Sequence, residues 1–133
     1  MTRRGQEGQT LVLAAMVLAF LFVPLGVYVI DSGLVESGYA QLSETLQASA
    51  EDGASMIDES AYRSSGSAVL DPVSAREVAD RSMQVSRLPG LESWTINVQG
   101  KTVTVTARLR VVLFAVGSTT ITQARAARLA IGQ

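Results

Sequence analysis

The chain of 133 residues contains no cysteine and no histidine. It therefore has no thiol nucleophile, no imidazole base, no disulfide and no zinc site made from the usual cysteine and histidine ligands. Phosphate-binding loops, dinucleotide-binding fingerprints and calcium-loop patterns are also missing from the sequence. The formal net charge is −1, which gives no reason to expect nucleic-acid binding. We expect no catalytic residues, no cofactor and no metal site.

Proline is scarce as well: the chain has three, and none lies between residues 25 and 71. Because proline breaks helix interiors, this gap leaves room for a long helix. Charge is missing from residues 10–30, which read TLVLAAMVLAFLFVPLGVYVI. At 1.5 Å per residue they span roughly 30 Å, the thickness of a bilayer's hydrocarbon core. The sequence predicts a transmembrane helix over 10–30, kinked at Pro24, which cannot donate a backbone hydrogen bond.

The charges on either side of the apolar run differ. Arg3 and Arg4 precede it, whereas residues 31–60 contain seven acidic side chains and no basic one. Because basic residues favour the cytoplasmic side, we expect residues 1–9 to form a cytoplasmic leader and the chain after residue 30 to lie outside the cytoplasm. A cleaved secretory signal is the alternative. Its apolar core is only about 7–15 residues long and ends in an A-x-A-like site, which does not follow this run.

The helical pattern continues beyond the apolar run. Apolar and small residues recur there at spacings of three and four, as on one face of an amphipathic helix. They are Val35, Tyr39, Leu42, Leu46, Ala50, Gly53 and Ile57. The sequence therefore predicts one helix over residues 10–59, of which 31–59 form an extracytoplasmic extension. Gly33 and Gly38 weaken this helix by about 1 kcal/mol each relative to alanine, so a bend is expected near them.

A small domain is predicted over residues 60–133. Residues 60–70 are rich in serine and glycine and predict a loop. Asp71 and Pro72 are typical of a helix start and predict a short second helix over residues 72–87, ended by the Pro-Gly pair that follows. Its expected apolar stripe consists of Ala75, Val78, Ser82, Val85 and Leu88.

The last forty residues alternate between apolar and polar side chains, which is typical of half-buried strands. Residues 94–99 and 102–111 form two such runs, joined by a tight turn at Gly100 and Lys101. A break at residues 114–118 is followed by a third run over 119–131, for which helix is the alternative because its end is rich in alanine. The fold class is therefore α+β: a long N-terminal helix, a short second helix and a three-strand antiparallel sheet covered on one face by helix.

Two charge features bear on function. Residues 101–133 contain five basic side chains and no acidic one, opposite in sign to the acidic helix over 31–60. Such surfaces can meet within one subunit or between subunits. Glu77 and Asp80 lie three residues apart and so share a helix face, but no base, nucleophile or third ligand accompanies them. A solvated helix face is the better interpretation of this acidic pair.

Two segments carry a resemblance to a known family. The head, residues 4–13, reads RGQEGQTLVL, and Ile30-Asp31-Ser32-Gly33 introduces a continuation rich in Leu, Gln and Ala up to about residue 55. Both resemble the minor pilin-like proteins of tight-adherence pilus systems, the TadE/TadG-like family. The resemblance implies a pilin-like fold, a membrane location and a structural role in building or anchoring a pilus. The alternative is a single-pass membrane scaffold or sensor unrelated to pili.

The resemblance also implies processing. A prepilin peptidase cuts such proteins after a glycine at the cytoplasmic edge of the membrane, which here implies Gly8 with Gln9 as the new N-terminus. The second choice is Gly5 with Gln6. Pilins usually carry glutamate at the fifth mature position, whereas this chain has Leu13 or Thr10 there. That departure fits a minor subunit better than a major one.

The partners implied by the resemblance are other pilin or pilin-like subunits, the prepilin peptidase, an inner-membrane assembly platform and membrane lipid. An apolar helix that is stable in lipid is also stable among copies of itself, where small residues allow close approach. The candidate assembly positions on the helix are Leu13, Ala14, Ala15, Ala19, Pro24, Gly26, Asp31 and Gly33.

Overall fold

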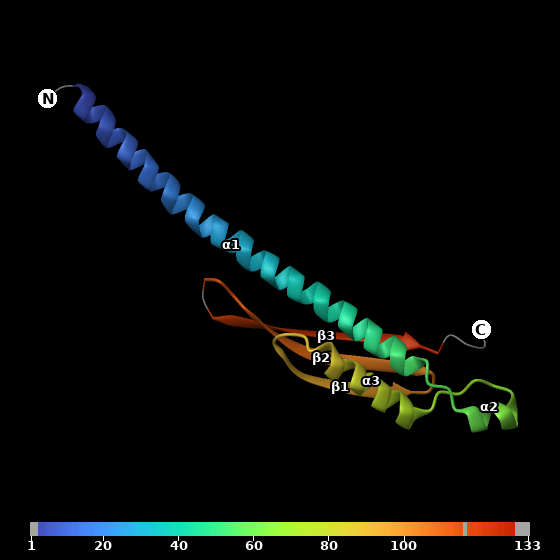
Figure 1. The fold of residues 1–133 in the computed structure, drawn as a ribbon. Coiled ribbons are helices and arrows are strands. Elements are labelled where there is room, and N and C mark those ends of the chain that lie inside the picture. The colour runs from blue at the N-terminus through green and yellow to red at the C-terminus, as the bar shows by residue number, and fades with distance from the viewer. Residues whose placement is uncertain (1–2, 116, 130–133) are drawn as a thin grey trace.

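A computed structural model describes residues 3–115 and 117–129 of the chain (Figure 1). Three helices precede three strands, which confirms the predicted α+β class. The helices are α1 (Arg3–Ala54), α2 (Glu59–Ser65) and α3 (Pro72–Ser86), and the strands are β1 (Leu91–Gln99), β2 (Thr102–Val112) and β3 (Ser118–Arg128). Figure 1 shows the blue half of α1 projecting away from a small domain formed by everything else.

Helix α1 contains 52 residues and runs without a break through Pro24, Gly33 and Gly38. The predicted bounds of 10 and 59 were wrong at both ends, because the helix begins at Arg3 and ends at Ala54. Beyond Ala54 the chain turns, and Ile57 pairs with Leu70 in an isolated β-bridge. Helical geometry at Ile57 is incompatible with that pairing, so α1 ends before it.

The sheet is antiparallel in the order β1-β2-β3. Val98 pairs with Val103 across the first hairpin, whose turn uses Gly100 at a φ of 58°. Residues 118–128 form a strand, which confirms the strand prediction over the helical alternative. Residues 130–131 of that predicted strand lie outside the described residues.

The core lies between the sheet and the two longer helices, which both pack on the same sheet face (Figure 1). Leu42, Leu46 and Ala50 of the predicted α1 stripe are fully buried, but Tyr39 is 49% exposed. Gly38 takes its place against the sheet, because a Cβ at Gly38 would lie only 2.8 Å from Val111 Cγ2. The strand residues that complete the core alternate along β2: Val103, Val105, Ala107, Leu109 and Val111.

Helix α2 occupies the first part of the loop predicted over residues 60–70, so that prediction was wrong for residues 60–65. The Asp58 carboxylate caps its N-terminus by accepting hydrogen bonds from the backbone N–H groups of Ser60 and Ala61. Gly66, in the left-handed region at a φ of 71°, closes the other end. Every α2 residue stays exposed or half-buried, so this helix is held by its caps rather than by a core.

Helix α3 begins at the predicted place, with the Asp71 carboxylate accepting from two backbone N–H groups and Pro72 in the first turn. Its predicted apolar stripe was partly wrong. Ala75 is buried as expected, but its buried companions are Ala79 and Met83, while Val85 is 72% exposed. Ala75, Ala79 and Met83, spaced four residues apart, form the buried side of α3, and Val85 lies off it. Within that side the approach to α1 is close at Ala79, whose Cβ would lie only 3.2 Å from a Cβ added at Gly53.

Candidate functional site

The apolar part of α1 is exposed on every side. From residue 10 to residue 30 all side chains are exposed except the half-buried Val27, and Phe20 reaches 84% exposure. A helix in water buries at least one apolar stripe, so a helix that is apolar all round needs an apolar environment. This part of α1 is long and apolar enough to cross a membrane.

Five of the small residues on α1 share one side of the helix. At 3.6 residues per turn, Gly8, Ala15, Ala19, Gly26 and Gly33 fall within about 40° of one another around the helix axis. We call these five residues the small-residue face. A Cβ added at any of the three glycines would meet no other described atom within 4 Å, so the backbone is open to a neighbour there.

The small-residue face points away from the domain. Gly33 and Leu42 are nine residues apart, which is two and a half helical turns, so they lie on opposite sides of α1. Leu42 is fully buried against the sheet. The face that allows close helix approach is therefore not blocked by the chain's own domain.

The other predicted assembly positions do not join this face. By the same helical geometry, Leu13, Pro24 and Asp31 lie on the opposite side of α1, the side that also carries Leu42. Ala14 lies between that side and the small-residue face. The predicted processing residues Gly5, Gln6, Gly8 and Gln9 are exposed and lie in the first turns of α1.

Asp31 has a role that the sequence did not reveal. Its carboxylate oxygen Oδ1 accepts a hydrogen bond from the backbone N–H of Phe114 at 2.7 Å. This contact ties the turn between β2 and β3 to the end of the apolar run, across 83 residues of sequence. No sequence pattern marks this contact, because its donor is a backbone N–H group and its place depends on the lengths of β2 and β3.

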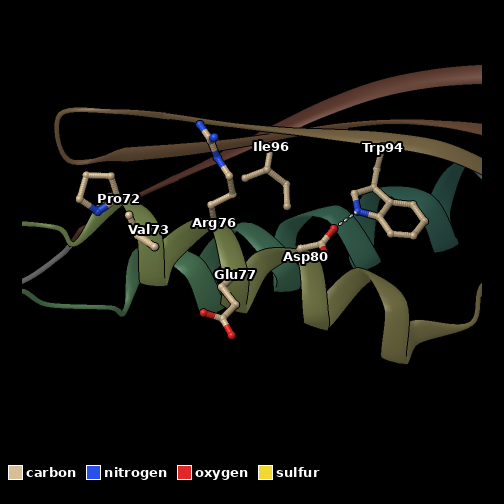
Figure 2. A pocket seen from close by; sticks show the side chains of 7 residues that line it. All are labelled: Pro72, Val73, Arg76, Glu77, Asp80, Trp94 and Ile96. Atoms are coloured by element: carbon tan, nitrogen blue, oxygen red, sulfur yellow. Dashed lines mark hydrogen bonds between the residues drawn. The ribbon is translucent and has the colours of Figure 1, made fainter.

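A groove between α3 and β1 contains the acidic pair that sequence analysis considered (Figure 2). Asp80 accepts a hydrogen bond from the Trp94 indole N–H at 2.7 Å. Glu77 instead accepts from the Arg81 guanidinium at 3.3 Å, and Figure 2 shows its side chain pointing away from Trp94. The two carboxylates are therefore engaged separately. The described residues contain no group of three His, Cys, Asp or Glu side chains that could hold a metal ion.

The opposite charges of helix and sheet lie on different surfaces except at Arg125, which lines a shallow hollow together with Glu44 and Glu51. Glu44 and Glu51 are exposed on α1, on the same side as the small-residue face, whereas Arg108 and Arg110 are exposed on the sheet face away from the helices. The salt bridges within the described residues join side chains four apart on α2 and α3. Arg125, on the helix side of the sheet, donates to the Ser43 hydroxyl at 2.9 Å.

A search of protein-family models found no match to this chain, and neither did searches of curated proteins and of solved structures. The resemblance of residues 4–55 to the TadE/TadG-like family remains a prediction. Function has to be inferred from the geometry of α1 and its domain.

Proposed function

We propose that this chain is a membrane-anchored, pilin-like structural subunit that takes part in pilus assembly or anchoring. Residues 10–30 lie in the cytoplasmic membrane, residues 1–9 lie in the cytoplasm, and the domain lies outside. The observation that carries the proposal is the continuity of α1, whose apolar part over residues 10–30 is exposed and whose C-terminal part belongs to the buried core of the domain. A helix that moves between lipid and a filament would therefore carry its domain with it.

The small-residue face supports the proposal. Transfer of an apolar helix from lipid to a bundle of helices exchanges one apolar environment for another, so close packing decides the outcome. Ala15, Ala19, Gly26 and Gly33, the members of the small-residue face that remain after a cut behind Gly8, offer that packing on the side of α1 opposite the domain. A neighbouring α1 can approach there without meeting the sheet.

The charge distribution also favours contacts between copies. The acidic side of α1 and the basic outer face of the sheet remain exposed within one subunit. Opposite charges on separate surfaces orient approaching partners more than they stabilise the complex, because exposed ion pairs contribute only about 0–1 kcal/mol each. An arrangement in which one copy's sheet faces the next copy's helix would use both.

The mature N-terminus tests the proposal against a single-pass scaffold or sensor. The full-length chain would be produced in bacterial membranes with and without a prepilin peptidase, and its N-terminus determined by mass spectrometry. We expect a start at Gln9 that depends on the peptidase. Gly8→Val should abolish this cut, while Gly5→Val serves as the matched control and should leave it intact. An uncut chain in the presence of active peptidase would contradict the proposal and favour the scaffold.

Cross-linking tests the assembly surface. The chain has no cysteine, so a single one can be introduced on either side of α1. Ala19→Cys places a thiol on the small-residue face, and Leu21→Cys places one about 200° round the helix from it. Oxidation in membranes should give dimers through position 19 in clear excess over position 21. Equal yields at both positions would mean that α1 does not pack through this face.

A further inference from the structure

The turn between β2 and β3 lies at the membrane end of the domain. Figure 1 shows this hairpin extending along α1 toward the N-terminus, beyond the rest of the sheet. Its backbone is held to Asp31 by the 2.7 Å hydrogen bond from Phe114. Asp31 is the first charged residue after the apolar run of α1. The hairpin therefore reaches the level at which a membrane-spanning α1 leaves the hydrocarbon core.

The end of this hairpin is apolar and uncovered. Val112 and Phe114 are each 70% exposed, Ala115 is exposed and Leu113 is half-buried. We call residues 112–115 the hairpin tip. Hairpin turns in water are normally rich in Gly, Asn, Asp and Ser, so four consecutive apolar residues at this place are unusual for a solvated loop. Arg110, just behind the tip, is exposed and donates to the Ser118 hydroxyl at 2.9 Å.

We propose that the hairpin tip inserts into the interfacial region of the outer leaflet and forms a second membrane contact beside α1. The inference rests on the proposed placement of α1 in the bilayer. Lipid is the occupant that the geometry favours, because the exposed tip is held by Asp31 beside the end of the exposed apolar part of α1. Phe114 and its neighbours enter the acyl boundary, and the Arg110 guanidinium is placed to meet lipid phosphates.

Insertion of the hairpin tip would restrict how α1 moves in the bilayer. A single helix can rotate about its axis and tilt in a bilayer, and flanking anchor residues limit both motions. With the tip inserted on one side, tilting α1 away from that side would lift apolar side chains out of the membrane. The fold, through the Asp31 contact, determines which side of α1 faces the hairpin, and the inserted tip keeps that side away from a neighbouring helix.

Site-specific fluorescence on the full-length chain in phosphatidylcholine–phosphatidylglycerol vesicles tests this inference. Single cysteines are labelled with an environment-sensitive fluorophore and quenched by lipids carrying a nitroxide at a shallow or a deep position. Ala115→Cys reports on the tip while keeping Phe114 intact. Phe20→Cys reports on the apolar run of α1, and Tyr62→Cys on α2, at the far end of the domain, is the exposed control.

We expect the label at position 115 to be blue-shifted and quenched more strongly by the shallow nitroxide than by the deep one. Adding Phe114→Asp should reduce this quenching to the level at position 62, while the label at position 20 remains quenched by the deep nitroxide. Unchanged Trp94 emission would show that the Phe114→Asp domain is still folded.

Three results would overturn the inference. If position 115 is quenched no more strongly than position 62 while position 20 is still quenched, the insertion of the tip is refuted but the membrane anchor is not. A lack of quenching at position 20 would remove the membrane anchor itself and the inference with it. A blue shift at position 115 that lipid nitroxides do not quench, and that disappears when the protein is diluted in lipid, would mean that a second copy covers the tip.

Discussion

Gly53 lies where α1 crosses α3 and β2, and replacing it by alanine tests whether that crossing is as close as the structure indicates. A Cβ at this position would lie 2.9 Å from the backbone oxygen of Ala75. It would also lie 3.2 Å from both Ala79 Cβ and Val103 Cγ1. The Ala75 oxygen belongs to the first turns of α3 and cannot move unless that helix shifts. We therefore expect Gly53→Ala to destabilise the domain.

The magnitude follows from two opposing effects. Alanine improves helix propensity over glycine by about 1 kcal/mol at most, and less near the end of a helix. Overpacking a filled site costs about 1–3 kcal/mol. The matched control is Gly33→Ala, which makes the same change in the same helix where an added Cβ meets no described atom within 4 Å. Gly33 lies in the interior of α1 and Gly53 next to its end, so the propensity gain is no larger at Gly53 and the free energies of unfolding should differ by at least about 1–3 kcal/mol.

Thermal unfolding of the full chain in detergent micelles measures this difference. Trp94, the single tryptophan of the chain, lies at the contact between α3 and β1 and reports on the domain. In a domain of this size 1 kcal/mol shifts the Tm by about 4–8 °C, so Gly53→Ala should melt at least about 4 °C below Gly33→Ala. Equal melting temperatures, or a higher one for Gly53→Ala, would refute the close approach of the two helices at this point.

Three further changes test other contacts of the domain. Leu46→Ala removes a fully buried side chain between α1 and the sheet and should cost about 2–5 kcal/mol in the same melting assay. Asp80→Ala removes the acceptor of the Trp94 indole N–H, so we expect a shift in Trp94 emission and a loss of only about 1 kcal/mol, since water reaches the half-buried ring. Asp58 titrates in acid: the Ser60 hydroxyl, followed by backbone N–H groups, holds its pKa below the usual 3.8. Its carboxylate therefore stabilises α2 fully above the unfolded pKa, and this contribution is lost as the pH falls through the lower folded pKa. NMR shifts of the α2 amides should show that loss on acidification, and Asp58→Asn, which keeps a cap but cannot ionise, should abolish it.

The periodicity of apolar residues predicted the fold correctly for helices and strands that bury only one face. The alternation of β2 and the spacing of Leu42, Leu46 and Ala50 on α1 gave the core correctly, because each element has one face against the other. Periodicity failed where shape rather than apolarity selects the contact. Tyr39 was expected to face the sheet, but Gly38 lies there because Val111 comes too close for a larger residue.

Close packing also explains the error in α3, whereas helix α2 was missed for a different reason. In α3, Val85 is more apolar than Ala79, yet Ala79 is buried and Val85 exposed. Ala79 lies on the side of α3 that approaches α1, where its Cβ would be 3.2 Å from a Cβ added at Gly53. Helix α2 lacks an apolar stripe, so only its caps mark it in the sequence. Asp58 before it and Gly66 after it are such marks, and both lie inside or beside a stretch whose serine content favoured a loop.

Part of the candidate site could be predicted from the sequence and part could not. The apolar run and its small residues were visible in the sequence, because length and composition alone define them. The sequence did not predict that these small residues lie on the side of α1 opposite the domain. That position depends on which side of the C-terminal part of α1 packs against the sheet. The contact between Asp31 and Phe114 depends on the length of β2 and β3, which together carry the hairpin back to the end of the apolar run.

The hairpin tip and the small-residue face form one arrangement at the membrane surface. Asp31 holds the tip, and it lies about 160° round the helix from Gly33. A tip inserted in the outer leaflet therefore occupies the space beside one side of α1 and leaves the opposite side open to another helix. That open side is where Gly26 and Gly33 permit close approach. The domain lies outside the hydrocarbon core, yet its hairpin tip would block the Asp31 side of α1. It would thereby leave the small-residue face as the side on which another helix packs.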